Sequence, residues 1–336
     1  MRRPLLFLAV VFLGSMTVAV ESILAGSPVS QQAYMKASNP DPADNFGDAV
    51  SISGDIAVVG APSEAGPSSG VNGNQFANGK SESGAAYVFA RNGGSWVQEA
   101  YLKASNSKSG DDFGSAVAVS GSTVVVGSPG EDSNSVGVDG VQNGLGASRS
   151  GAVYVFVKEG AAWVQQAFIK APNTDEFDGF GASVALAGDT LVVGAFSEDS
   201  AASTINGNAT DNSSPGAGAA YVYVRSGTTW SFQSYLKASN CGAGDGFGSV
   251  VAISGDTVLV SALQEASNAR GVNGDQLNNS LNGAGAVYVF TRSGASWAQQ
   301  AYLKASNSGG LDYFGSAIAI SGDTAVIGAN YEDSHA

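Results

Sequence analysis

Three kinds of charged residue return at fixed places along the chain and are its first candidates for chemistry. Aspartates stand two residues before a Phe-Gly pair, glutamates follow a short apolar run, and lysines end a segment of mixed polarity. They are Asp44, Asp111, Asp178, Asp245 and Asp312; Glu64, Glu131, Glu198, Glu265 and Glu332; and Lys36, Lys103, Lys170, Lys237 and Lys304. Carboxylates could bind a cation, but a specific site should break the symmetry between repeats. We therefore interpret these residues as structural, forming aspartate turns and lysine–carboxylate pairs that tie one repeat to the next.

Histidine and cysteine, two common catalytic residues, each occur once in the chain. The one histidine, His335, is next to the last residue, which nearly excludes a buried histidine base. The one cysteine, Cys241, has no counterpart in other repeats and no histidine to activate it, so we interpret it as an incidental thiol. A single cysteine also excludes an intrachain disulfide and a cysteine-rich zinc site. We predict no catalytic residue and no metal site.

Tyrosines and tryptophans recur with the same spacing as the charged residues. They are Tyr87, Tyr154, Tyr221 and Tyr288, and Trp96, Trp163, Trp230 and Trp297. Exposed rings could be platforms for sugars, but aromatic residues at fixed positions in strands are far more often packing residues. We expect these rings in the core.

Long loops rich in Gly, Asn, Ser and Asp carry the remaining signal for binding. They span 63–83, 130–150, 197–217 and 264–284, and the candidate ligand-binding residues in them are Asn72, Asp139, Asn206 and Asn273. Asn-Gly is also simply a good turn former. The stretch from Asp132 to Asp139 faintly resembles a calcium loop, although its fifth position is valine. Calcium therefore stays an open alternative to the expectation of no cofactor.

A repeat of 67 residues places all these side chains. Phe-Gly begins at Phe46, Phe113, Phe180, Phe247 and Phe314, and each number exceeds the one before by 67. The lysine, tyrosine and tryptophan series keep the same step, so the repeats have no net insertion or deletion. Self-similarity at a fixed period indicates a repeat architecture.

Each repeat contains four strand-like segments, A to D. Segment A alternates large and small residues (116–120), B is continuously apolar (123–126), C has a Tyr-Val centre (153–156), and D runs from tryptophan to lysine (297–304). A Gly-Asp or Gly-Ser pair joins A to B as in a tight hairpin, and about twenty residues join B to C. We predict an all-β fold, a β-propeller of four-stranded antiparallel blades with A innermost and D outermost. A β-solenoid is the structural rival, but its rungs are much shorter.

About 4.5 blades are present in this chain. Complete units start at residues 46, 113, 180 and 247, whereas the unit from Phe314 supplies only A and B. Residues 31–36 are typical of an orphan D strand that completes the last blade. We expect an open arc or a strained five-blade closure, and a longer native protein.

The string from Phe46-Gly47 to Gly60-Ala61-Pro62 resembles the FG-GAP repeat, the unit of the integrin α-subunit propeller. The resemblance covers essentially the whole chain from residue 26 to residue 336 and supports the propeller fold. Related repeats often carry a calcium loop between the first two strands, but here only Ser-Gly-Asp occupies that place, so the family's calcium sites are not carried over. In integrin-like relatives the long-loop face docks ligands, which the resemblance implies for this chain too.

The amino terminus and the overall charge bear on location and partners. Arg2 and Arg3 precede an apolar stretch and then small residues near Ala25, which is the layout of a signal peptide over residues 1–25. No other stretch is long and apolar enough to span a bilayer. A formal net charge of −14 makes nucleic acid a poor partner.

Two functional classes follow from these patterns. The favoured one is a secreted or cell-surface binding or adhesion scaffold, whose unidentified extracellular protein or glycan ligand contacts the long loops on one face. The alternative is the propeller portion of a larger secreted enzyme whose catalytic domain lies elsewhere. The enzyme class predicts one blade with unique catalytic residues, and the sequence shows none.

Overall fold

A computed structural model of the protein describes residues 6–9 and 31–333. The described residues form nineteen β-strands, and they contain no helix of the length and apolar character that crossing a membrane requires. The predicted signal peptide at 1–25 lies outside the described residues, except for β1 (Leu6–Ala9).

The predicted segments A to D are all formed, and each complete repeat folds into one four-stranded antiparallel sheet. The A strands are β2 (Val50–Ser53), β6 (Ala116–Ser120), β10 (Ser183–Ala187), β14 (Phe247–Ser254) and β18 (Phe314–Ser321). The B strands are β3 (Ile56–Ala61), β7 (Thr123–Ser128), β11 (Thr190–Ala195), β15 (Thr257–Ala262) and β19 (Thr324–Ala329). The C strands are β4 (Ala85–Asn92), β8 (Ala152–Glu159), β12 (Ala219–Ser226) and β16 (Ala286–Ser293). The D strands are β5 (Ser95–Leu102), β9 (Ala162–Ile169), β13 (Thr229–Leu236) and β17 (Ser296–Leu303).

We number the sheets as blades 1 to 5 in chain order, with strand order A-B-C-D in blades 1 to 4. Each A–B hairpin turns on a glycine with positive φ, such as Gly121 at 56°, which a residue with a Cβ adopts less readily. Each C–D pair has a register shift at the same place, as between Val155 and Phe156. The repeat therefore extends to irregular backbone as well as to sequence.

The fifth sheet differs from the others. It consists of β18 and β19, with β1 paired parallel to β19. Residues 31–36 form no strand, so the expected orphan D strand is not formed. In the complete blades the D strand forms backbone hydrogen bonds with the C strand. Among the described residues, blade 5 has no C strand with which residues 31–36 could form them.

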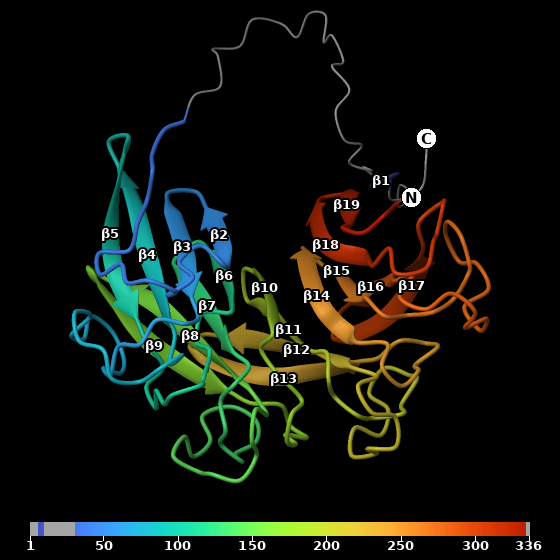
Figure 1. The fold of residues 1–336 in the computed structure, drawn as a ribbon, viewed down its shortest axis with the longest axis horizontal. Coiled ribbons are helices and arrows are strands. Elements are labelled where there is room, and N and C mark those ends of the chain that lie inside the picture. The colour runs from blue at the N-terminus through green and yellow to red at the C-terminus, as the bar shows by residue number, and fades with distance from the viewer. Residues whose placement is uncertain (1–5, 10–30, 334–336) are drawn as a thin grey trace, which may run out of the picture.

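The blades stand side by side in an open arc (Figure 1). Their A strands are innermost, with β2 beside β6, β6 beside β10, β10 beside β14 and β14 beside β18. The core lies between neighbouring blades: Val58 and Leu102 of blade 1 pack against Phe113 and Val124 of blade 2, and all four are fully buried. Of the two expected arrangements, the structure has the open arc.

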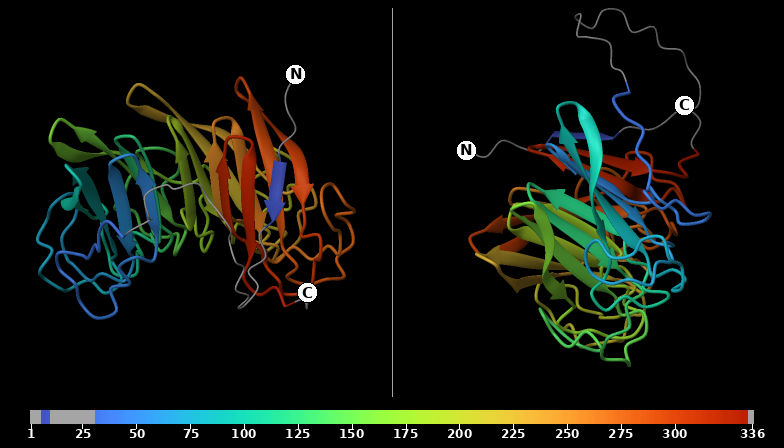
Figure 2. Two further views of the ribbon diagram at one scale, coloured as in Figure 1. Left: turned by 90° about the horizontal axis from the view of Figure 1, so that it is seen from above. Right: turned by 90° about the vertical axis from the view of Figure 1, so that its left-hand side faces the viewer.

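The two rims of the arc are unlike each other. Because the strands alternate in direction, the short A–B and C–D hairpins emerge on one rim, and the long B–C and D–A connections emerge on the other (Figure 2, left). We call the second rim the loop face. All the candidate sites described below lie on or just beneath it.

Candidate functional site

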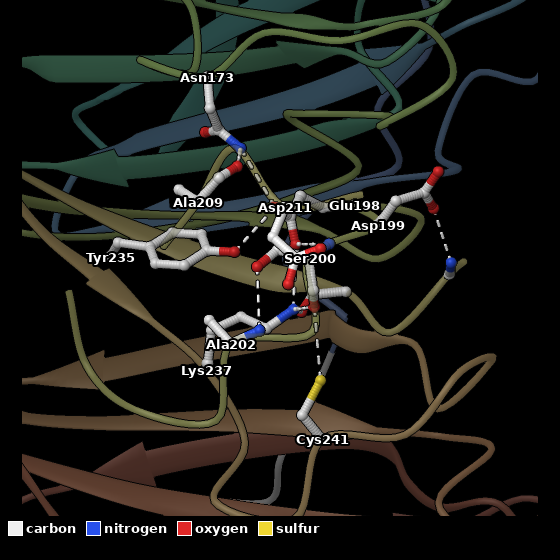
Figure 3. A network of polar contacts seen from close by, with 12 residues as sticks. Asn173, Glu198, Asp199, Ser200, Ala202, Ala209, Asp211, Tyr235, Lys237 and Cys241 are labelled. Atoms are coloured by element: carbon white, nitrogen blue, oxygen red, sulfur yellow. Dashed lines mark hydrogen bonds and ion pairs between the residues drawn. The ribbon is translucent and has the colours of Figure 1, made fainter. Parts of the chain in front are cut away.

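A buried polar network lies under the loop face of each complete blade. Figure 3 shows the network of blade 3. In blade 3, Lys237 Nζ donates to Glu198 Oε2 at 3.0 Å and to the Ser200 and Gly218 carbonyls at 2.7 Å each. Tyr235 donates to the other oxygen of the same carboxylate at 2.8 Å. Both charged side chains are almost wholly buried. Burying an ion pair is costly, and here hydrogen bonds to the remaining donors and acceptors offset that cost.

The same ion pair recurs in the other complete blades, as Lys103–Glu64, Lys170–Glu131 and Lys304–Glu265. Burial is the main cause that lowers the pKa of Lys103, Lys170 and Lys304. In each case the lysine and the glutamate belong to one blade, because strands B and D both end at the loop face, on either side of strand C. The interpretation that these pairs tie one blade to the next is therefore wrong.

A series of recurring asparagines forms the hydrogen bonds between neighbouring blades instead. Asn173, in the connection from blade 2, donates to Glu198 Oε1 at 3.1 Å and accepts a hydrogen bond from Tyr221 of blade 3 at 2.9 Å. Its counterparts toward the glutamates are Asn39, Asn106, Asn240 and Asn307. The asparagines have the 67-residue spacing too, so the sequence contains this signal although the analysis above did not use it.

The recurring aspartates form the expected turns. Asp111 accepts the backbone N–H of Lys108 at 2.6 Å, and Asp178 accepts that of Asp175 at 3.1 Å. Burial raises the pKa of Asp111 and of Asp245 to about 7 and that of Asp178 to about 8. Their repetition and their turn bonds assign them to the architecture.

Neighbouring blades approach most closely where Phe-Gly meets the end of a B strand. A Cβ added to Gly60 would lie 2.0 Å from the carbonyl oxygen of Gly114, so no side chain fits at this position. Within blade 2, Phe113 packs edge-on against Tyr154, with ring centroids 5.3 Å apart. The Phe-Gly pair of one repeat and the Gly-Ala of the preceding repeat thus meet in one contact between neighbouring blades. We call each such contact, with the loops around it, a joint.

This joint is built from the residues that define a known repeat. The profile of the FG-GAP repeat matches the chain at residues 29–89, 96–156, 163–223, 230–290 and 297–336. The chain belongs to the FG-GAP repeat family. No curated protein matches it in a sequence comparison.

The tryptophans of the FG-GAP blades are packing residues, as expected. Trp163 and Trp230 are buried, and their indole N–H groups donate to Glu99 and Gln166 of the preceding blade at 3.0 and 2.9 Å. Trp96, at the open end of the arc, is only half-buried. The repeat-wide rings therefore hold blades together.

Cys241 lies at the edge of the blade 3 network. Its thiol is half-buried and donates to the Ser200 carbonyl at 3.5 Å. Burial raises the thiol pKa, which lowers the fraction of reactive thiolate. The geometry gives this side chain no activating base.

The four predicted ligand-binding residues take part in one repeated contact. Asn72 Oδ1 accepts a hydrogen bond from the backbone N–H of Tyr101 at 2.9 Å, and the backbone N–H of Asn72 donates to the Tyr101 carbonyl at 2.8 Å. Asp139, Asn206 and Asn273 bond in the same way to Phe168, Tyr235 and Tyr302. Each thus fastens its loop to the outermost strand of its own blade, so the structure does not bring the four together. That they contact a ligand stays a prediction.

In the stretch that faintly resembles a calcium loop, the first and last carboxylates accept hydrogen bonds from backbone N–H groups. Asp132 accepts the backbone N–H of Arg149, and Asp139 accepts that of Phe168, both at 2.9 Å. Within residues 6–9 and 31–333, no group of three or more His, Cys, Asp or Glu side chains is placed to hold a metal ion.

One joint on the loop face departs from the others. At every joint the same two backbone hydrogen bonds link a B–C loop to the next D–A connection. Between blades 3 and 4 they run from Gly244 to Pro215 and from Gly246 to Gly216, at 2.8 and 3.0 Å. The residues at three positions of this contact, one in the B–C loop and two in the D–A connection, differ between the joints. They are Glu82, Gly110 and Asp112 at the first joint; Arg149, Phe177 and Gly179 at the second; Gly216, Gly244 and Gly246 at the third; and Gly283, Leu311 and Tyr313 at the fourth. Only the third joint, between blades 3 and 4, has glycine at all three positions.

A hollow of about 530 Å³ opens above these glycines. Phe196, which is 43 % exposed, and Leu263 provide apolar walls, and Ser197, Ser249 and Gln264 line the rest. The position of Phe196 is proline in blades 1 and 2, so the sequence did contain a signal for this site. It was missed because the glycines become adjacent only when loops from two blades meet.

Proposed function

We propose that this protein is a binding or adhesion scaffold, secreted or held at the cell surface, that presents its loop face to an extracellular protein or glycan. The observation that carries the proposal is the hollow between blades 3 and 4. A specific site should break the symmetry of the repeat, and this joint breaks it on an unchanged backbone. Rigid scaffolds usually bind through such loops.

The lining of the hollow favours a neutral sugar residue as the group that enters it. No charged side chain lines the hollow. The Phe196 ring offers a flat apolar surface, and Ser197, Ser249 and Gln264 offer hydroxyl and amide groups. Ligand pockets typically combine apolar walls with a few polar groups that fix orientation. The formal net charge of −14 disfavours an anionic ligand.

Filling the hollow tests the proposal. Gly244 has φ of 79°, and a Cβ there would meet no atom within 4 Å. The equivalent residue Phe177 has φ of 66°, so this backbone already accepts a phenylalanine elsewhere in the chain. Gly227→Phe is the matched control, because Gly227 lies in the C–D hairpin of blade 3 on the opposite rim, with φ of 63° and open space around its Cβ.

The probe is a panel of neutral oligosaccharides of hexoses and N-acetylhexosamines, screened by saturation-transfer NMR and titrated by calorimetry. We expect at least one to bind, Gly244→Phe to weaken its binding tenfold or more, and Gly227→Phe to leave it unchanged. Absence of binding across the panel would overturn the sugar assignment. Binding that is equally strong in Gly244→Phe would place the ligand elsewhere.

A further inference from the structure

Phe177 is an exposed aromatic residue at a backbone position that favours glycine. Its position in the D–A connection has φ between 66° and 80° in all five repeats, at Ala43, Gly110, Phe177, Gly244 and Leu311. Bulky side chains rarely adopt positive φ, and Phe177 is the one aromatic residue of the five. The residue is also 59 % exposed, so burial of the ring offsets little of the backbone strain.

The backbone of this connection does not require the ring. The N–H of Phe177 donates to the Ser148 carbonyl at 2.7 Å, and Gly110 makes the same bond to Ser81 at 3.0 Å without a side chain. Strained backbone positions that the fold does not need are concentrated at functional sites. An exposed phenylalanine at such a position therefore indicates contact with a ligand.

Phe177 lies next to the hollow between blades 3 and 4. Ala182, which lines the hollow, follows Phe177 by five residues. Between them, Gly179 lies against the aromatic wall of the hollow, because a Cβ added there would meet Cε1 of Phe196 at 3.6 Å. The chain thus runs from one exposed ring to the edge of the other.

The short segment 178–181 leaves the surface between Phe177 and the hollow open. Asp178 and Phe180 are buried, and the other two residues of the segment are glycines. No side chain of this segment therefore projects between the ring of Phe177 and the hollow. A single ligand can extend from one to the other across the loop face of blade 3.

The charges around Phe177 favour a neutral ligand here, as the lining does in the hollow. Asp175 and Glu176 precede the ring and are exposed, so they would repel an anionic group. The nearby cation, Arg149, is paired with Asp112 at 3.2 Å. The same chemical class of ligand therefore suits both places.

We propose that Phe177 forms a second aromatic subsite, and that the hollow and Phe177 together bind separate units of one neutral oligosaccharide chain. The inference rests on the proposed function, because it extends the site between blades 3 and 4. One sugar unit packs on Phe196 in the hollow, and a unit further along the chain packs on Phe177. A ligand that reaches both rings binds more tightly than one that fills only the hollow, because the second contact costs no further loss of overall motion.

A length series of oligosaccharides tests the inference. The probes are β-1,4-linked oligomers of glucose, of mannose and of N-acetylglucosamine, each from two to six units long, titrated by calorimetry. We expect the affinity of at least one series to rise tenfold or more from dimer to hexamer. Phe177→Gly should remove this rise and leave binding of the dimer unchanged, and it should fold normally because Gly110 and Gly244 hold the same position. Phe76→Gly is the matched control, because Phe76 is 75 % exposed in the B–C loop of blade 1.

The outcomes separate this inference from the proposed function. If the dimer binds and Gly244→Phe prevents it, the site in the hollow stands. Equal affinity for dimer and hexamer, or a rise with length that Phe177→Gly leaves intact, would then overturn the second subsite alone. A loss of dimer binding in Phe177→Gly would also overturn it, because the ring would then belong to the hollow itself. Absence of binding by every oligomer would overturn the inference together with the assignment of a sugar ligand.

Discussion

The joint between blades 2 and 3 and the joint between blades 3 and 4 have the same framework and different surfaces. The blade that precedes each joint contains a buried ion pair, Lys170–Glu131 or Lys237–Glu198, and both joints have the same pair of backbone hydrogen bonds. Arg149 and Phe177 lie at the joint between blades 2 and 3, whereas the joint between blades 3 and 4 has only glycines at the equivalent positions. The candidate site therefore depends on the absence of side chains at this joint, because the backbone hydrogen bonds are the same at both joints.

This comparison separates what holds the arc together from what gives it specificity. Residues that repeat in every blade are buried and hydrogen-bonded, so changing them should affect stability at any joint alike. Residues that differ between joints lie on the loop face and contribute little to stability, so changing them should affect binding alone. The predictions below test this separation, beginning with the largest expected effect.

Removing one partner of the buried ion pair should have the largest effect. Lys170→Met and Lys237→Met each leave a glutamate buried without its cation, which typically costs about 3–5 kcal/mol. Because the two networks are alike, urea denaturation should give similar losses for both variants. Arg149→Met is the control, because its pair with Asp112 is partly exposed. A loss in only one of the two lysine variants would contradict the idea of a common framework.

The tryptophans should show the next largest effect and a clear dependence on position. Trp163→Ala should cost about 3–5 kcal/mol, since the ring is buried between two blades. Trp96→Ala should cost clearly less, because Trp96 has no preceding blade and is half-buried. Thermal unfolding of the two variants compares them directly, and equal losses would contradict the account of the blade interfaces.

Much of this framework could be predicted from the sequence because it is local or periodic. The hairpin at Gly121 and the buried B strand at 123–126 depend on nearby residues alone, and the Phe-Gly spacing fixes the blade. The pairing of Lys237 with Glu198 could not be assigned to one blade, because it spans strand C, from the end of strand D to the end of strand B. The hollow requires two loops to meet across a joint, and no single repeat contains that information.

The buried aspartates should make stability depend on pH in the same direction at both joints. The folded state raises the pKa of Asp178 to about 8 and that of Asp245 to about 7, so the native protein holds protons that the unfolded chain releases near pH 4. The stabilisation from these groups is therefore complete below about pH 4 and is lost as the pH rises through 7 and 8. We expect the free energy of unfolding to fall between pH 5 and pH 8, with a slope of up to about 1.4 kcal/mol per pH unit for each proton.

Single variants isolate each contribution to this pH profile. Asp178→Asn and Asp245→Asn should each flatten it, because asparagine keeps an oxygen for the turn and does not titrate in this range. Urea denaturation at four pH values measures the slope. A slope that neither variant reduces would mean that other groups titrate on unfolding.

The smallest effect on stability should come from Phe196→Pro, which gives blade 3 the residue that blades 1 and 2 have as Pro62 and Pro129. The backbone at this position already accommodates proline twice, and the phenylalanine ring is 43 % exposed, so little apolar burial is lost. We expect a change of about 1 kcal/mol or less, in line with surface substitutions. The same variant removes the aromatic wall of the hollow and should weaken binding of a neutral oligosaccharide tenfold or more by calorimetry. Pro129→Phe is the reverse control: it adds a ring at the joint where Arg149 and Phe177 hold the positions of Gly216 and Gly244, and it should create no second site. Binding that survives Phe196→Pro would contradict the role of the aromatic wall, and a second site in Pro129→Phe would show that the bare glycines are not required.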